Sequence, residues 1–178
     1  NGAFRGCTSL EGITIPSTVK VIGRYTFSDC SQLRNVELPD GLESIDNGAF
    51  RGCTSLEGIT IPSTVKVIGR YTFSDCSQLR NVELPDGLES IDDGAFRGCT
   101  SLEGITIPST VKEIRELAFN GCRSLEGITI PSTVKVIGSY AFSDCSQLRN
   151  VELPDGLESI DNGAFRGCTS LEGITIPS

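Results

Sequence analysis

The chain has 178 residues, a formal net charge of -8 and no histidine, methionine or tryptophan. The negative charge disfavours binding to nucleic acid or to a membrane surface, because both need a basic protein surface. No apolar run is long enough to predict membrane insertion.

A 23-residue unit recurs along the chain, and residues 1–46 and 47–92, each two units long, are identical. A period this strict predicts a solenoid of stacked units. We expect one solenoid over residues 1–178, about eight repeats long and part of a longer array. Each unit is marked by a phenylalanine with a cysteine three residues later, at Phe4, Phe27, Phe50, Phe73, Phe96, Phe119, Phe142 and Phe165.

The first element expected in each unit is a short strand. Ile13 and Ile15 alternate with polar residues, which predicts a strand with both isoleucines on one face. Pro16 ends it, because proline lacks the N–H that a strand ladder needs. The same slot predicts a proline column at one border of the sheet, continued by Pro39, Pro62, Pro85, Pro108, Pro131, Pro154 and Pro177.

The rest of the unit must return the chain to the next strand. Residues 19–22 are expected to turn it back, and the one-turn spacing of Phe27 and Cys30 predicts a brief helix or 3₁₀ segment. The expected fold is therefore α/β: a right-handed solenoid with one parallel β-sheet of short strands and short helical or 3₁₀ returns.

Residues 49–62 read A-F-R-G-C-T-S-L-E-G-I-T-I-P, and this pattern extends over all 178 residues. It closely resembles the BspA-like class of leucine-rich repeats found in bacterial and protist surface proteins. The resemblance implies an extracellular or cell-surface adhesin that binds host or matrix proteins, and it names no ligand. The slot of a buried asparagine in many leucine-rich repeats holds Thr18 or Gly41, so the backbone groups there need other partners.

The eight cysteines occupy one slot, which stacking places in a column roughly 5 Å apart, the spacing of adjacent strands. Identical slots point their side chains in parallel rather than toward each other, which disfavours disulfides. We predict buried, reduced core thiols. A metal site is not expected, because the chain has neither a CxxC pair nor histidine.

Two kinds of unit alternate, and their charges alternate with them. Because equivalent positions become neighbours in a parallel in-register sheet, one column runs Glu11, Arg34, Glu57, Arg80, Glu103 and another Lys20, Glu43, Lys66, Glu89, Lys112. Alternation avoids stacking like charges, which costs up to about 1 kcal/mol per pair.

The alternation slips once, where residues 116–138 follow a unit of their own kind. The slip puts Glu103 beside Glu126 and Lys112 beside Lys135. The chain departs most from its template at the same junction, and we interpret the changes as local compensation; random drift is the alternative. The changed residues are Glu113, Arg115, Glu116, Leu117 and Arg123.

Another column alternates tyrosine with glycine. Tyr25, Tyr71 and Tyr140 each have glycine in the same slot of a neighbouring unit. We expect each ring to pack over bare neighbouring backbone. The alternative is a row of aromatic anchors for lateral contact with a partner.

No catalytic constellation is visible, so the chain is not expected to be an enzyme or to hold a cofactor. No histidine activates a serine or cysteine, and no phosphate-binding loop is present. A weak divalent-cation site at Glu37, Asp40 and Asp46 is a minor alternative. A flat threonine array for a lattice such as ice is disfavoured, because Glu37 and Glu83 interrupt Thr14, Thr60 and Thr106.

Two function classes remain. In the first, the exposed strand face binds a protein or glycan at a surface. In the second, the chain assembles with further copies of itself into a fibre or spacer, since near-identical units suit repetitive targets or self-assembly. The face residues predicted for the first are Glu11, Gly12, Thr14, Arg34, Asn35, Glu37, Glu57, Thr60, Arg80, Asn81 and Glu83.

Overall fold

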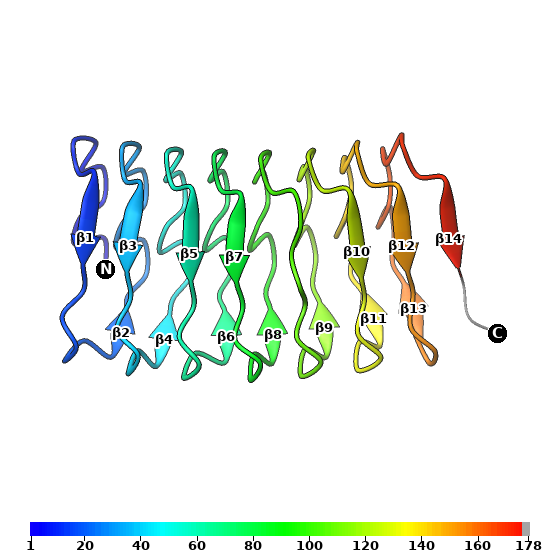
Figure 1. Cartoon of the computed structure of the whole chain (residues 1–178), viewed down its shortest axis with the longest axis horizontal. Helices are drawn as coiled ribbons and strands as arrows, with labels where there is room; N and C mark the ends of the chain where they lie inside the picture. Colours follow the sequence, from blue (N-terminus) through cyan, green and yellow to red (C-terminus); the bar gives the residue numbers. More distant parts are fainter. Residues whose placement is uncertain (176–178) are drawn as a thin grey trace.

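The computed structural model describes residues 1–175 and is a solenoid of stacked coils, with its first and last described coils at opposite ends of the stack (Figure 1). Most coils contribute a three-residue strand to one side, and a two-residue strand recurs on the other side in every coil from Val21 to Ile160. The three-residue strands are β1 (Gly12–Thr14), β3 (Asn35–Glu37), β5 (Gly58–Thr60), β7 (Asn81–Glu83), β10 (Gly127–Thr129), β12 (Asn150–Glu152) and β14 (Gly173–Thr175). The two-residue strands are β2 (Val21–Ile22), β4 (Ser44–Ile45), β6 (Val67–Ile68), β8 (Ser90–Ile91), β9 (Glu113–Ile114), β11 (Val136–Ile137) and β13 (Ser159–Ile160).

The predicted strand around Ile13 is present, and its register follows the sequence period. Gly12 pairs with Asn35 and Ile13 with Val36 in a parallel ladder. The middle residue of the inner three-residue strands faces the core, as Ile59 does at 6% exposure. Because the register equals the period, each slot of the sequence becomes a column of the structure. Pro177, the last predicted member of the proline column, lies outside the described residues.

The prediction of a single sheet was wrong. Residues 19–22, expected only to turn the chain, contain a second strand, and the two-residue strands pair continuously from β2 to β13 in one seven-stranded sheet. Each of these strands ends in a β-branched isoleucine, which favours a strand; Ile22, for example, points into the core while Val21 stays exposed. By contrast, the three-residue strands form separate sheets, β1-β3, β5-β7 and β10-β12-β14.

The predicted helical returns were also wrong, because residues 1–175 contain no helix. Tyr25 and Asp29 have positive φ angles of 55° and 61°, which a right-handed helix does not accommodate. The N–H groups of the return alternate between two kinds of acceptor. Cys30 N–H donates within its own coil to Phe27 O at 3.2 Å, whereas Phe27 N–H donates to Ala49 O of the next coil at 2.8 Å. The return is thus a run of tight turns hydrogen-bonded to the neighbouring coil.

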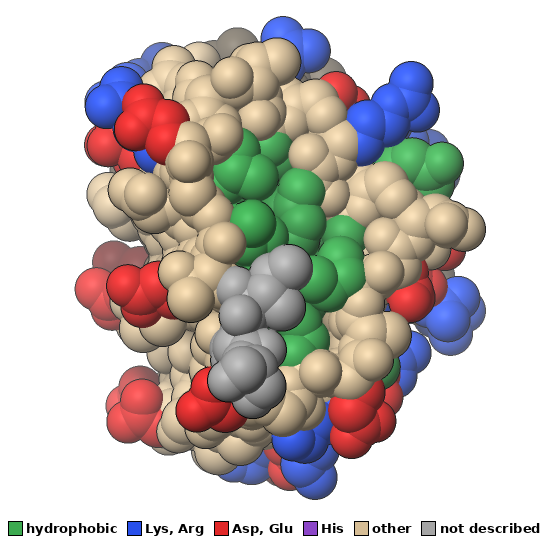
Figure 2. Space-filling model, turned by 90° about the vertical axis from the view of Figure 1, so that its right-hand side faces the viewer, with side chains coloured by type: hydrophobic (Ala, Val, Ile, Leu, Met, Phe, Trp, Pro, Cys, Tyr) green, Lys and Arg blue, Asp and Glu red, His purple; other side chains and the backbone are tan. Residues whose placement is uncertain are grey.

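The core is a set of columns inside a polar shell. The rings from Phe4 to Phe165 stack nearly parallel, with adjacent centroids 5.2–5.6 Å apart. Viewed from the C-terminal end, apolar side chains occupy the middle of the molecule and most charged side chains its rim (Figure 2). Stacking therefore buries in each coil an apolar edge that a single coil leaves open.

Threonine side chains hydrogen-bond to backbone groups in the slot where many leucine-rich repeats have a buried asparagine. Thr110, in the same slot as Thr18, donates its hydroxyl to the carbonyl oxygens of Asp86 at 2.7 Å and Leu88 at 2.6 Å in the preceding coil. The hydroxyl of Thr133 reaches Val111 O at 2.6 Å in the same way. This slot hydrogen-bonds one coil to the next.

The prediction of reduced core thiols is confirmed for the six inner cysteines, which are free and buried. Cys7 is exposed and Cys168 half-buried. Each inner thiol donates to a phenylalanine carbonyl of the preceding coil, as Cys53 Sγ does to Phe27 O at 3.1 Å. Burial raises the pKa of Cys53 and of Cys122 to about 12. A thiolate is therefore strongly disfavoured in the folded column.

These raised pKa values predict alkaline destabilisation. The contribution of each thiol to stability is fully present below the ordinary pKa of 9.0 and is lost as pH rises toward about 12, because the unfolded chain ionises first. Between pH 8 and 10.5 we expect a loss on the order of 1–2 kcal/mol per inner thiol, measured by urea unfolding. The Cys53→Ala variant should lose less over the same interval, and an equal loss in the variant and the wild type would contradict this assignment.

Candidate functional site

The three-residue strands carry the predicted ligand face, and two adjoining shallow grooves run across them. One, of about 640 Å³, crosses β3, β5 and β7. The other, of about 1100 Å³, crosses β7, residues 104–107, β10 and β12. Asn81 and Glu83 line both. We call the two together the strand groove; it follows the long axis of the solenoid.

The strand groove gathers about half of the predicted face residues. Asn35, Glu37, Thr60, Asn81 and Glu83 line it. The rest of the predicted face does not line either groove: Glu11, Gly12, Thr14, Arg34, Glu57 and Arg80.

The prediction missed Asn150 and Glu152, which line the groove on the far side of the repeat slip. They occupy the same slots as Asn81 and Glu83, so extending the columns past the slip would have found them. It also missed Gly104, which lines the larger groove.

Threonines hold the groove carboxylates in place. Thr14 Oγ1 donates to Glu37 Oε2 at 2.9 Å, and Thr60 Oγ1 donates to Glu83 Oε2 at 3.0 Å. A longer bond of 3.4 Å joins Thr129 to Glu152. Each glutamate is thus oriented by the threonine of the preceding coil.

The strand ladder is interrupted within the larger groove. Residues 104–106 occupy a strand slot but form no strand. A Cβ atom added at Gly104 would meet nothing within 4 Å, whereas one at Gly12 would lie 3.6 Å from Asn35 O. Ile105 is half-buried, while its counterpart Ile59 is buried. The coil spacing on this face is therefore looser at the slip.

The alternating charge columns form few direct contacts. Within residues 1–175, no member of the Glu11–Arg34 column lies within ion-pair distance of an opposite charge. Lys20 Nζ instead donates to Gly41 O at 3.2 Å. We therefore expect any effect of the alternation to act through the average field between neighbouring coils, which salt screens.

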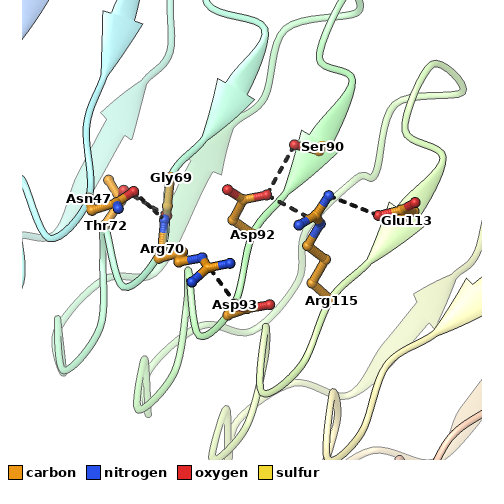
Figure 3. Close-up of polar contacts among 9 residues, drawn as sticks. All are labelled: Asn47, Gly69, Arg70, Thr72, Ser90, Asp92, Asp93, Glu113 and Arg115. Carbon is orange, nitrogen blue, oxygen red and sulfur yellow. Dashed lines mark hydrogen bonds and ion pairs between the residues drawn. The ribbon is translucent and has the colours of Figure 1, made fainter.

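Arg115 forms ion pairs at the slip junction, on the side of the two-residue strands and away from the strand groove (Figure 3). Its Nε lies 3.4 Å from Asp92 Oδ1 and its Nη2 lies 3.1 Å from Glu113 Oε2. This supports local compensation at the slip, because two changed residues pair there. Arg123 takes no part in it: among the described residues it forms no ion pair with Glu103 or Glu126.

A cation site at Glu37, Asp40 and Asp46 gains no support. Over residues 1–175, no group of three or more acidic or cysteine side chains is arranged to hold a metal ion. The described part of the chain also contains no helix long and apolar enough to cross a membrane.

Comparison with known proteins agrees with this architecture. A family model described as the BspA type leucine-rich repeat region, in six copies, matches residues 1–126 and 68–178. The chain belongs to this family. No match was found among curated proteins.

Three solved bacterial structures are similar to this BspA-type chain. A leucine-rich repeat protein of T. pallidum is 38% identical, with 89% of this chain and 72% of that chain covered and a TM-score of 0.77. One from Bacteroides ovatus is 30% identical, with 97% and 57% covered and a TM-score of 0.67. A leucine-rich cell surface protein of Faecalibacterium prausnitzii is 28% identical, with 98% and 62% covered and a TM-score of 0.51. The chain thus spans less than two thirds of the last two proteins.

The tyrosines of the BspA-type chain pack as the first hypothesis expects. A Cβ atom added at Gly48 would lie 2.5 Å from Tyr25 Cε1, so the ring covers the glycine of the next coil. Tyr71 and Tyr140 cover Gly94 and Gly163 in the same way. The rings keep 36–40% of their surface exposed, and their use for lateral contact with a partner stays a prediction.

This packing predicts the effect of filling the glycine slot. Gly48→Ala should cost about 1–3 kcal/mol of unfolding free energy, because Gly48 has a φ of +65° and the new methyl group meets the Tyr25 ring. Adding Tyr25→Ala should recover the steric part but not the backbone part, as measured in a double-mutant cycle. Gly104→Ala is the control and should change stability little; strict additivity of the two changes would contradict the packing.

Proposed function

We propose that this BspA-type solenoid is a binding scaffold at the cell surface or outside the cell, whose strand groove captures a protein or glycan ligand. The observation that carries the proposal is the groove itself, a polar furrow that crosses successive coils and repeats its chemistry. The family and the cell-surface neighbour from Faecalibacterium prausnitzii support the location.

The groove has the chemistry of a recognition surface. Asn35, Asn81 and Asn150 present side-chain amides, and the coils between them have glycine in the same slot. Threonine hydroxyls lie beside the glutamate carboxylates that they orient. Such groups hydrogen-bond to peptide groups and to sugar hydroxyls alike. Repetition of one weak contact along the groove raises affinity for an extended ligand through avidity.

Filling the groove tests the proposal. Gly104→Trp places a large side chain in the open part of the groove, where a Cβ atom meets nothing, so the fold should tolerate it. We expect ligands found on a glycan array or a panel of immobilised matrix proteins to bind at least about tenfold more weakly, a loss of about 1.4 kcal/mol or more.

The matched control is Gln78→Trp, which places the same side chain at an exposed position of a return segment. It should leave both binding and melting temperature unchanged. If Gly104→Trp retains wild-type binding to every ligand, or if the wild type binds none, the proposed function is wrong.

Self-assembly is the second candidate, and the flank of the solenoid favours it. Val21 and Val67 in the two-residue strands are 51% and 41% exposed, and Tyr25 and Tyr71 follow four residues later in the same coils. This apolar row repeats every second coil, as a lateral contact between parallel copies requires.

Particle mass separates the two candidates. Light scattering across a wide concentration range should give a constant mass if the groove is the functional surface. A mass that grows with concentration in the wild type, and that Val21→Ser with Val67→Ser suppresses, would instead establish assembly through the flank.

A further inference from the structure

The charged side chains of the strand groove all carry the same sign. They are Glu37, Asp40, Glu83 and Glu152, and no lysine or arginine is among the lining residues. Over the whole chain the two signs are interspersed, with 15 basic and 23 acidic residues. A groove lined only by carboxylates attracts a cationic occupant and repels an anionic one.

Each groove glutamate is held by one hydrogen bond, and its second carboxylate oxygen has no hydrogen-bond partner within residues 1–175. In each of Glu37, Glu83 and Glu152 the threonine of the preceding coil binds Oε2, and Oε1 accepts no hydrogen bond from the described residues. All three side chains are exposed. Each presents a fixed anionic oxygen to solvent, and a charge-assisted hydrogen bond from an ammonium or guanidinium group would satisfy it.

Amides beside the carboxylates suit a polypeptide. The side chains of Asn35, Asn81 and Asn150 form no hydrogen bond within residues 1–175, and each lies two residues before a groove glutamate on the same exposed face. An asparagine amide both donates and accepts, so it matches the C=O and N–H of an extended main chain.

The groove carboxylates are unequally spaced, which suits a ligand with flexible side chains better than a rigid polymer with regularly spaced charges. Glu37 and Glu83 are two coils apart, and the phenylalanine rings below are stacked at 5.4 and 5.6 Å. Because of the repeat slip, Glu83 and Glu152 are three coils apart. A rigid polymer with one charge period matches only one of these spacings, whereas long lysine and arginine side chains reach both.

We propose that the strand groove binds an extended basic polypeptide segment, whose lysine or arginine side chains pair with Glu37, Glu83 and Glu152. The proposal rests on the proposed function and names the class of partner. Arg34, Arg80 and Arg149 lie three residues before these glutamates and outside the groove lining, so they repel cations placed on that side. The occupant is thereby confined to the carboxylate side of the face.

The test compares two charge-matched triple variants. The groove variant carries Glu37→Gln, Glu83→Gln and Glu152→Gln. The control carries Glu43→Gln, Glu89→Gln and Glu158→Gln, which are exposed glutamates of the same three coils outside the groove. Both lose three negative charges, so only the position of the charges differs.

The probe is a fluorescent oligolysine of roughly 20 residues, ~65 Å long when extended. Its affinity is measured by anisotropy at low and at physiological salt. We expect the groove variant to bind at least about tenfold more weakly and with a shallower salt dependence, and the control variant to stay within about threefold of the wild type. An oligolysine with acetylated side chains should not bind the wild type.

An equal loss in both variants, or no binding of oligolysine to the wild type, would overturn the basic-peptide proposal. Neutral 1,4-linked glucan oligosaccharides form the second arm. If they bind, and Gly104→Trp blocks them while oligolysine does not discriminate between the triple variants, the groove is a glycan site and only the partner class fails. If Gly104→Trp blocks neither probe nor any array ligand, the proposed function itself fails.

Discussion

Parallel hydrogen bonding between coils 23 residues apart constrains everything else in this molecule. It places equivalent positions of successive coils next to each other, so a residue type that recurs at one position forms a column along the stack. A phenylalanine becomes a pile of rings, and a buried cysteine becomes a column of thiols bonded to backbone carbonyls. Polar slots obey the same rule, which is why an oriented carboxylate at one coil becomes a lined groove.

If identical coils stacked directly, bulky side chains would clash and like charges would lie side by side at several positions. Alternation of two coil types avoids both. Tyrosine requires glycine above it, and glutamate on the strand face is oriented by threonine below it. The structural unit is therefore a pair of coils. The strand ladders follow this pairing before the slip, since β1 bonds to β3 and β5 to β7 with no ladder between β3 and β5, whereas after it β12 bonds to both β10 and β14.

The sequence predicts the elements whose residue types are specific to one conformation, and it misses those that depend on context. Alternating Ile13 and Ile15, with the proline after them, predicts the strand face and its register. The return is not predictable in this way, because tyrosine at a positive φ is rare and only stacking on the next coil holds Tyr25 there. Of the predicted face, Asn35, Asn81, Thr60, Glu37 and Glu83 line the strand groove, and their role in binding stays a prediction. The interruption at residues 104–106 falls at the repeat slip, which the sequence marks. Its letters G-I-T are those of β5 and β10, so no local pattern predicts the lost strand.

The two strand columns differ in continuity, and this gives the solenoid an anisotropic stiffness. The two-residue strands form one unbroken seven-stranded sheet, while the opposite side is divided into three separate sheets. Continuous strand pairing along one side of the stack resists stretching on that side, whereas the interrupted pairing on the other side resists it less. We therefore expect bending to be concentrated at the breaks on the groove side, where it would open or narrow the groove while the phenylalanine column remains packed. Such a molecule would adjust its curvature to the contour of the surface that lies against it.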